Sequence, residues 1–182
     1  MARQLKQAVI EASVPAAPVQ SLSERVEDYL DSNRWNYSKG EGRQAFAMDV
    51  AVRDGRVRVV LNVLEAEGLQ QVLVYSIFPI FVPEHSRARM AEGISRINYA
   101  TIFGNFEMDL SDGEVRVRTL AESDGALGDA MIARALRTNI DAASSYFVRI
   151  LGVAFGNAAA ETMLEPVTKD EATAVLQSTT LQ

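Results

Sequence analysis

The sequence predicts a single α+β domain in which an antiparallel sheet of about five strands packs against helices. Three observations carry this prediction. Two segments alternate apolar with other residues on both sides of an Asp-Gly pair, as the strands of a hairpin do. Three further segments repeat apolar residues at steps of three and four, as amphipathic helices do. A length of 182 residues suits one domain.

Composition limits the classes of function. The chain is 48% hydrophobic and 23% charged, and it contains no cysteine, so it uses neither disulfides nor thiolate chemistry. Its net charge of -6 disfavours general attraction to nucleic acid or to an anionic membrane. No run of about 18 apolar residues predicts a membrane span. We therefore expect a cytoplasmic protein without nucleic-acid partners, membrane contacts, metals or cofactors.

The N-terminal region predicts a tail followed by a helix. Residues 1–19 lack sustained periodicity, and Pro15 and Pro18 oppose a continuous helix, so we expect a flexible tail. Ser21 and Glu24 have the spacing of a capping box, in which each side chain satisfies a free backbone N–H of the other residue. A helix should follow, with one apolar stripe made by Leu22, Val26, Tyr29 and Leu30.

A hairpin should follow this helix, because alternation runs from Phe46 to Val63 and is interrupted at Asp54-Gly55. That pair suits a tight turn, since glycine tolerates positive φ and aspartate bonds to its own backbone. The turn predicts that Val52 faces Val57 and that Val50 faces Val59. A third strand is expected at Gln71–Ile77, after a turn at 65–68.

The second helix should begin at Pro83 and end near Gly104, a residue able to adopt the left-handed conformation of a helix C-terminus. A second hairpin is then expected to turn on Asp112-Gly113. Its predicted pairs are Leu110 with Val115, Met108 with Val117, Asp109 with Arg116 and Glu107 with Arg118. Charges opposed in this way stabilise a sheet by roughly 0.2–1 kcal/mol per pair and require no reaction to explain them.

Two asparagines are candidates for either structure or binding. Asn98 follows Ile94 by four residues and should lie beside the buried stripe of the second helix. We interpret Asn98 as a tie from the helix to a neighbouring loop or strand, and Asn105 as support for the turn after Gly104. The alternative is a pair of ligand-binding amides, which fits few reaction templates without a charged or nucleophilic neighbour.

The third helix is predicted to span Asp129 to Leu151. The expected element order is α-β-β-β-α-β-β-α. We assign residues 20–157 to the α+β domain and residues 158–182 to a C-terminal extension that is weakly helical or disordered, with a short helix before Pro166 and another after it.

The segment "YSIFPIFVP" at 75–83 is unusually apolar for a connection between a strand and a helix. Apolar surface patches often mark partner sites, so Phe78, Ile80, Phe81 and Val82 are the candidate partner-binding residues. The alternative is that the segment crosses under a helix into the core.

The string "VPEHSRARMAEGISRINYATIFGNFEMDLSDGEVRVRT" at 82–119, with "YFVRILGVAFGNAAAE" at 146–161, resembles the YbjN family of bacterial sensory-transduction regulators. Val148 departs from the proline that often follows the Tyr-Phe pair in that family. The resemblance covers roughly Ser21 to Glu161. It implies a fold similar to that of type III secretion chaperones, which are non-enzymatic domains that bind protein segments and often form homodimers. It implies no catalytic residue.

These observations favour a non-enzymatic protein-interaction module, either chaperone-like or a regulatory adaptor, whose client the sequence does not identify. A small-ligand sensor domain is the alternative, and a metal-dependent enzyme built on clustered acidic residues is a weaker one. No phosphate-binding glycine loop or nucleophile elbow occurs, and a serine triad would depend on His85, which falls in a predicted first helical turn.

Overall fold

The computed structural model describes residues 20–179 except 41, 43, 67, 167 and 168. The predicted tail at 1–19 lies outside the described residues. Six strands, four α-helices and a 3-10 helix make up the described part of the chain. The elements are α1 (Leu22–Ser32), β1 (Ser38–Lys39), β2 (Ala45–Val52), β3 (Gly55–Ala66), β4 (Leu69–Phe81), α2 (Glu84–Ala100), β5 (Asn105–Met108), β6 (Glu114–Ser123), α3 (Asp129–Phe155), η2 (Ala160–Leu164) and α4 (Lys169–Thr179).

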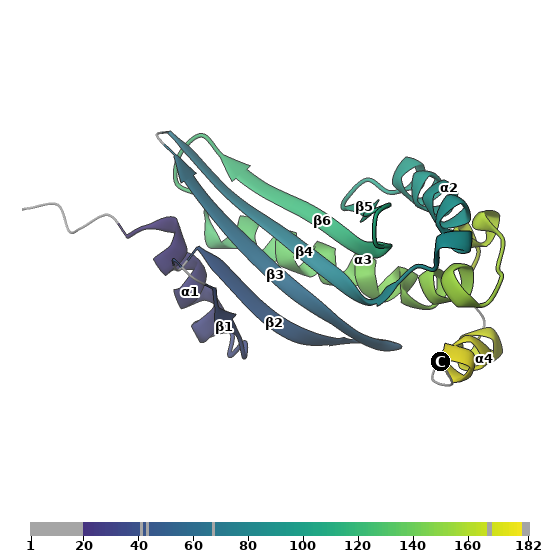
Figure 1. Cartoon of the computed structure of the whole chain (residues 1–182). Coiled ribbons are helices and arrows are strands. Elements are labelled where there is room, and N and C mark those ends of the chain that lie inside the picture. The colour runs from purple at the N-terminus through teal and green to yellow at the C-terminus, as the bar shows by residue number, and fades with distance from the viewer. Residues whose placement is uncertain (1–19, 41, 43, 67, 167–168, 180–182) are drawn as a thin grey trace, which may run out of the picture.

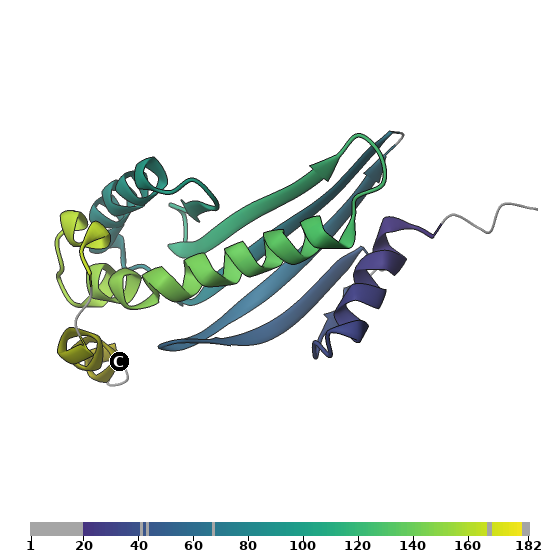
Figure 2. The ribbon, with the colours of Figure 1, turned by 180° about the vertical axis from the view of Figure 1, so that it is seen from behind.

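The strands form one antiparallel sheet in the order β1-β2-β3-β4-β6-β5, which confirms the predicted α+β class. Figure 1 shows α3 lying behind the sheet, and Figure 2 shows it from the other side, with α1 beside it. Helix α2, η2 and α4 gather around the C-terminal end of α3. The sheet therefore buries one face under helices, while no helix in the described part of the chain covers the other face.

Helix α1 begins as its sequence predicts. The Glu24 amide donates to Ser21 Oγ at 3.3 Å, and the Ser21 amide donates to Glu24 Oε2 at 2.9 Å, so the capping box is complete. Leu22, Val26 and Leu30 are fully buried on the face that meets the sheet and α3.

The first hairpin is shifted from its predicted register. Val50 pairs with Val57, and Val52 pairs with Gly55, so the turn contains Arg53 and Asp54 rather than Asp54 and Gly55. The predicted Val52–Val57 pair is therefore wrong. The shift moves every residue by two positions along the partner strand, which leaves each side chain on its expected face of the sheet.

The second hairpin has a longer turn than predicted. Met108 pairs with Val115 instead of Val117, which places Leu110 outside the strands. The Gly113 amide closes the turn by donating to the Asp109 carbonyl at 2.8 Å, and Gly113 has a φ of 90°. A Cβ there would also lie 2.4 Å from the Val82 carbonyl oxygen, so this position needs glycine on two grounds.

The ion pairs of this hairpin differ from the predicted ones. Glu107 accepts from both Arg116 and Arg118 at 2.9 Å. Asp109 is not paired across the strands with Arg116. It accepts hydrogen bonds from the Ser111 hydroxyl at 2.6 Å and the Ser111 amide at 2.8 Å, and these bonds hold the pKa of its carboxyl below the usual value.

Helix α2 is tied to β5 by Asn98. The side-chain amide of Asn98 donates to the Phe106 carbonyl at 3.0 Å and accepts from the Phe106 amide at 2.8 Å. The helix ends at Ala100, and Gly104, with a φ of 81°, lies in the loop beyond it, so Gly104 is not the predicted helix C-cap. Asn105 is exposed and opens β5.

Helix α3 runs four residues further than predicted, to Phe155. It is held on the sheet by Asn139, a fully buried side chain whose Nδ2 donates to the carbonyls of Val74 and Val117 at 3.0 Å each. Thr119 Oγ1 adds a bond to the Ala135 carbonyl at 3.0 Å. One amide thus joins α3 to two neighbouring strands, β4 and β6.

The segment before Pro166 packs against the rest of the domain. Ala160 and Met163 of η2 are buried, and Met163 lies against Gly93 of α2, where a Cβ would come within 2.8 Å of Met163 Cγ. Helix α4 follows and packs on α3. None of the helices in the described part of the chain combines the length and apolar composition that a bilayer crossing needs.

Replacing Asn98 by alanine should destabilise the domain by about 1–3 kcal/mol, because the Phe106 amide and carbonyl would lose their partners in a partly buried place. Urea unfolding of the two proteins measures this difference. Asn105→Ala, at an exposed position nearby, is the matched control and should change the free energy of unfolding by less than about 0.5 kcal/mol. Equal effects of the two substitutions would contradict the assigned role of Asn98.

Candidate functional site

The apolar segment at 75–83 is mostly the end of a strand rather than a connection. Strand β4 continues to Phe81, beyond the predicted end at Ile77, because the alternation of buried and open side chains persists. Pro79 is accommodated where pairing with β6 becomes irregular, between the Ile77–Arg116 and Phe81–Glu114 pairs.

Burial separates the four candidate partner-binding residues. Phe78 is 2% exposed and Val82 is fully buried, so both belong to the core. Ile80 is half-buried, and Phe81 is 64% exposed. The core alternative therefore describes Phe78 and Val82, whereas Ile80 and Phe81 reach the surface.

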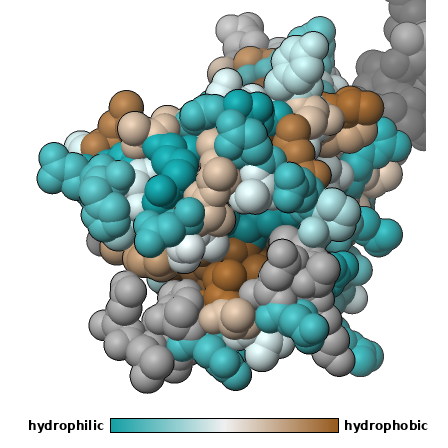
Figure 3. All heavy atoms as spheres, turned by 90° about the vertical axis from the view of Figure 1, so that its right-hand side faces the viewer, coloured by the Kyte–Doolittle hydropathy of each residue, from teal (hydrophilic) through white to brown (hydrophobic). Residues whose placement is uncertain are grey.

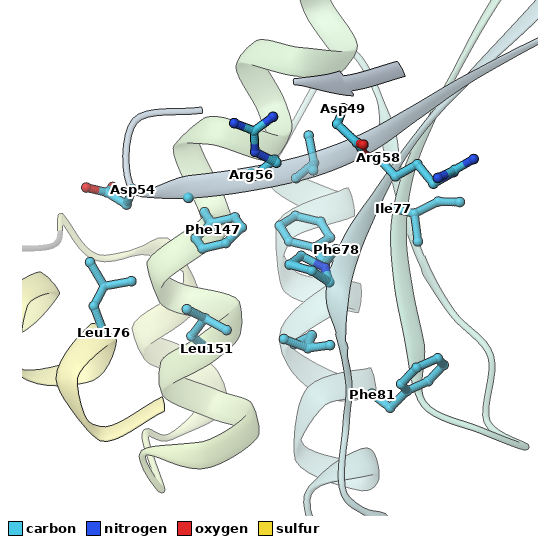
Figure 4. A pocket seen from close by; sticks show the side chains of 14 residues that line it. Asp49, Asp54, Arg56, Arg58, Ile77, Phe78, Phe81, Phe147, Leu151 and Leu176 are labelled. Atoms are coloured by element: carbon cyan, nitrogen blue, oxygen red, sulfur yellow. The ribbon is translucent and has the colours of Figure 1, made fainter. Parts of the chain in front are cut away.

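Ile80 and Phe81 lie beside an apolar hollow that we call the hairpin-end groove. Its volume is about 600 Å³, and it lies between the tip of the β2–β3 hairpin, the end of β4, the C-terminal half of α3 and α4. Figure 4 shows its side chains from close by. The apolar residues that line it are Val57, Ile77, Phe78, Pro79, Ile80, Phe81, Phe147, Leu151 and Leu176. The end of the molecule in Figure 3 is largely polar, with a recessed apolar area in its lower half.

Aromatic packing shapes one wall of this groove. The rings of Phe78 and Phe147 lie 5.8 Å apart, and Phe147 also faces the backbone of Gly55. A Cβ at Gly55 would come within 2.3 Å of Phe147 Cζ. Gly55 has no left-handed φ, so it is required by the approach of the ring and not by the turn.

Charged residues form the rim. Asp49, Asp54, Arg56 and Arg58 line the hairpin side of the groove, as their labelled side chains show in Figure 4. Neither Arg56 nor Arg58 has an ion-pair partner among the described residues. The groove can thus accept an apolar group and place a carboxylate near either guanidinium.

The other residues singled out from the sequence are engaged in the fold or lie apart from this groove. Both the NH2 group and the oxygen of the Asn98 side chain are hydrogen-bonded to the backbone of Phe106. Asp112 accepts from the Glu114 amide at 2.8 Å in the turn. His85 is exposed in the first turn of α2. No cluster of three metal-ligating side chains occurs among the residues that the structure describes.

Sequence reasoning missed Arg87, which fixes the loop at 110–112. Its guanidinium donates to the carbonyls of Val82 and Asp112 at 3.1 and 3.0 Å. It also donates to those of Leu110 and Ser111 at 3.0 and 3.2 Å. The only sequence signal was an arginine near the start of a helix, which does not identify distant backbone acceptors.

The part of the chain that the structure describes is a small α+β domain with a largely apolar groove at its surface. A family model described as "Putative bacterial sensory transduction regulator" matches residues 22–151. The chain belongs to this family, YbjN, and the resemblance predicted from the sequence is confirmed.

A solved structure supports the fold. The chain is similar to YbjN from E. coli, whose crystal structure is described as that of "a putative transcription regulator". The two share 15% sequence identity with a TM-score of 0.50, and the match covers 65% of this chain and 83% of that one. A search of curated proteins found no match.

Replacing Gly55 by alanine should destabilise the domain by about 1–3 kcal/mol, because the new Cβ overlaps the Phe147 ring. A double-mutant cycle with Phe147→Leu, read by urea unfolding, isolates this cause. In the Phe147→Leu background the cost of Gly55→Ala should fall below about 1 kcal/mol. An unchanged cost would show that the ring is not what requires glycine.

Proposed function

We propose that this protein is a non-enzymatic regulatory module that acts by binding a segment of another protein in the hairpin-end groove. The observation that carries the proposal is the exposed side chain of Phe81 beside a largely apolar hollow. Phe81 continues the apolar lining of the groove, and contiguous apolar surface with exposed aromatic side chains is typical of partner sites. Membership of a family described as regulators agrees with this role.

The lining suggests the chemistry of the client segment. Phe78, Phe147 and Leu151 offer aromatic and aliphatic contacts to an apolar side chain, and burial of one such side chain contributes about 1.5–3 kcal/mol. Arg56 and Arg58 can pair with a carboxylate next to that side chain, while Asp49 and Asp54 on the same rim restrict where it can lie. We therefore expect an apolar anchor flanked by an acidic residue, carried by a protein rather than by nucleic acid, given the net charge of -6.

Helix α4 takes part in the same surface. Leu176 of α4 lines the groove, and α4 packs only on α3 among its major contacts. A client that enters the groove would contact α4 or move it. A regulatory adaptor of this kind changes the activity or stability of its client without turnover.

A small-ligand sensor is the second candidate, and the size of the groove favours it. A volume of about 600 Å³ falls within the range of roughly 300–1,000 Å³ typical of ligand sites. A ligand that binds the folded state would raise the melting temperature in a saturable way. A thermal-shift screen with amphiphilic carboxylates therefore separates this candidate from a protein client.

Phe81→Ser should leave the folded state nearly unchanged and weaken client binding by at least about fivefold, because Phe81 is an exposed contact. Phe78→Ser should instead lower the free energy of unfolding by at least about 3 kcal/mol, since Phe78 is core. Quantitative capture from the native bacterial lysate measures the first effect, and urea unfolding measures the second.

Leu64→Ser is the matched control, because Leu64 is also an exposed apolar residue but lies outside the groove. It should capture the same proteins as the unaltered chain. The proposal fails if Phe81→Ser and Leu64→Ser capture the same proteins in the same amounts.

A further inference from the structure

Strand β6 has an edge that its neighbour covers only in part. Strand β5 pairs with β6 from Val115 to Arg118, whereas β6 continues to Ser123. On its other side β6 pairs with β4 as far as Ser123. The last residues of β6 therefore have a partner strand on one side only.

The free side presents backbone hydrogen-bonding groups. Glu114 accepts from the Asp109 amide across the β5–β6 hairpin, so its backbone points to the β5 edge. Alternate residues of an antiparallel strand point to the same edge, which places the amides and carbonyls of Leu120 and Glu122 on the open side. No backbone group of the described residues bonds them there.

A groove of about 760 Å³, which we call the edge groove, runs along this side between β6 and the N-terminal half of α3. Its floor consists of small residues, with Thr119 and Ala121 on β6 and Ala130 and Ala135 on α3. Exposed apolar side chains border it. They are Ile102 at 90%, Phe103 at 64%, Leu120 at 51% and Met131 at 43% exposure.

Strand β5 shows how a side chain occupies the neighbouring space. Phe106 points inward from β5 and packs edge-on against Tyr146 of α3, with ring centroids 5.0 Å apart. An extended segment placed further along β6 would direct its alternate side chains between β6 and α3 in the same way. The small floor residues leave room for large apolar side chains there.

Charge in the edge groove favours an acidic occupant. Arg134 is exposed and has no ion-pair or hydrogen-bond partner among the described residues, and Arg118 shares Glu107 with Arg116. Glu122 is engaged by the side-chain amide of Gln71. A carboxylate on the occupant would therefore meet Arg134.

A second copy of this chain fits the edge less well. Two β6 strands paired about Leu120 would match Arg118 with Glu122, but Asn105 of β5 already occupies the edge at Arg118. In the register that remains free, Leu120 would face the carboxylate of Glu122. These contacts disfavour a closed two-fold pairing through this edge.

We propose that the edge groove binds an extended segment of a partner protein as an additional strand of the sheet. Its backbone pairs with Leu120 and Glu122, its alternate apolar side chains fill the space between β6 and α3, and a carboxylate pairs with Arg134. The groove uses the N-terminal half of α3, whereas the hairpin-end groove uses Phe147 and Leu151 near the other end, so the two sites are separate.

The test selects, from a displayed library of random 12-residue peptides, those that bind the full chain. The affinity of one enriched peptide is then measured for the unaltered protein and for variants of it. Leu120→Pro removes the outward amide without removing a bond to β4, and Arg134→Glu reverses the groove charge. Each substitution should lower the affinity for the peptide by about tenfold or more. Phe81→Ser, in the hairpin-end groove, should leave its affinity unchanged. Amide hydrogen exchange should slow at Leu120 and Glu122 when the peptide binds.

Three results would overturn the proposal. The first is that no peptides are enriched, or that the enriched peptides bind the Leu120→Pro and Arg134→Glu variants as tightly as the unaltered protein. The second is peptide binding lost in Phe81→Ser but kept in Arg134→Glu, which would assign the peptides to the hairpin-end groove. The third is a dimer in light scattering whose Leu120 and Glu122 amides are already protected without peptide, which would make a second copy the occupant.

Discussion

The contact between α3 and the sheet is the constraint on which the rest of the structure depends. Asn139 lies fully buried between them and donates to the carbonyls of Val74 and Val117, so one side chain sets both the position of the helix and its rotation. An amide buried in this way must keep its partners, since a lost hydrogen bond there costs about 1–3 kcal/mol. The 27 residues of α3 then reach both grooves, with Arg134 near one end and Phe147 and Leu151 near the other.

Local chemistry explains which parts of this fold were predictable. The capping box at Ser21 and the apolar faces of both hairpins follow from neighbouring residues, and the structure contains them. The registers of the hairpins do not follow, because they depend on contacts that spacing cannot reveal. Phe147, more than 90 residues away in sequence, requires the glycine at position 55, and Ser111 bonds locally to Asp109 to lengthen the second turn.

Composition drew attention to the segment at 75–83 but did not predict its geometry. The apolar run at 75–83 lies beside the hairpin-end groove, but its residues continue β4, so alternation sends Phe78 inward and leaves Phe81 at the surface. Asn139 and Arg87 carried no comparable signal, because a single polar residue in a helix is usually solvated. Their roles depend on distant backbone carbonyls, which only the folded chain brings together.

The proposed function depends on contact between a client protein and the hairpin-end groove at Phe81. Site-specific photo-crosslinking tests this contact, with a benzophenone amino acid placed at Phe81 or, in a second protein, at Tyr99, which is exposed but does not line the groove. Irradiation in the native bacterium should give a discrete adduct of one protein from position 81 and none of that mass from position 99. Equal labelling from both positions, or no protein adduct from position 81, would show that no client contacts the groove at Phe81.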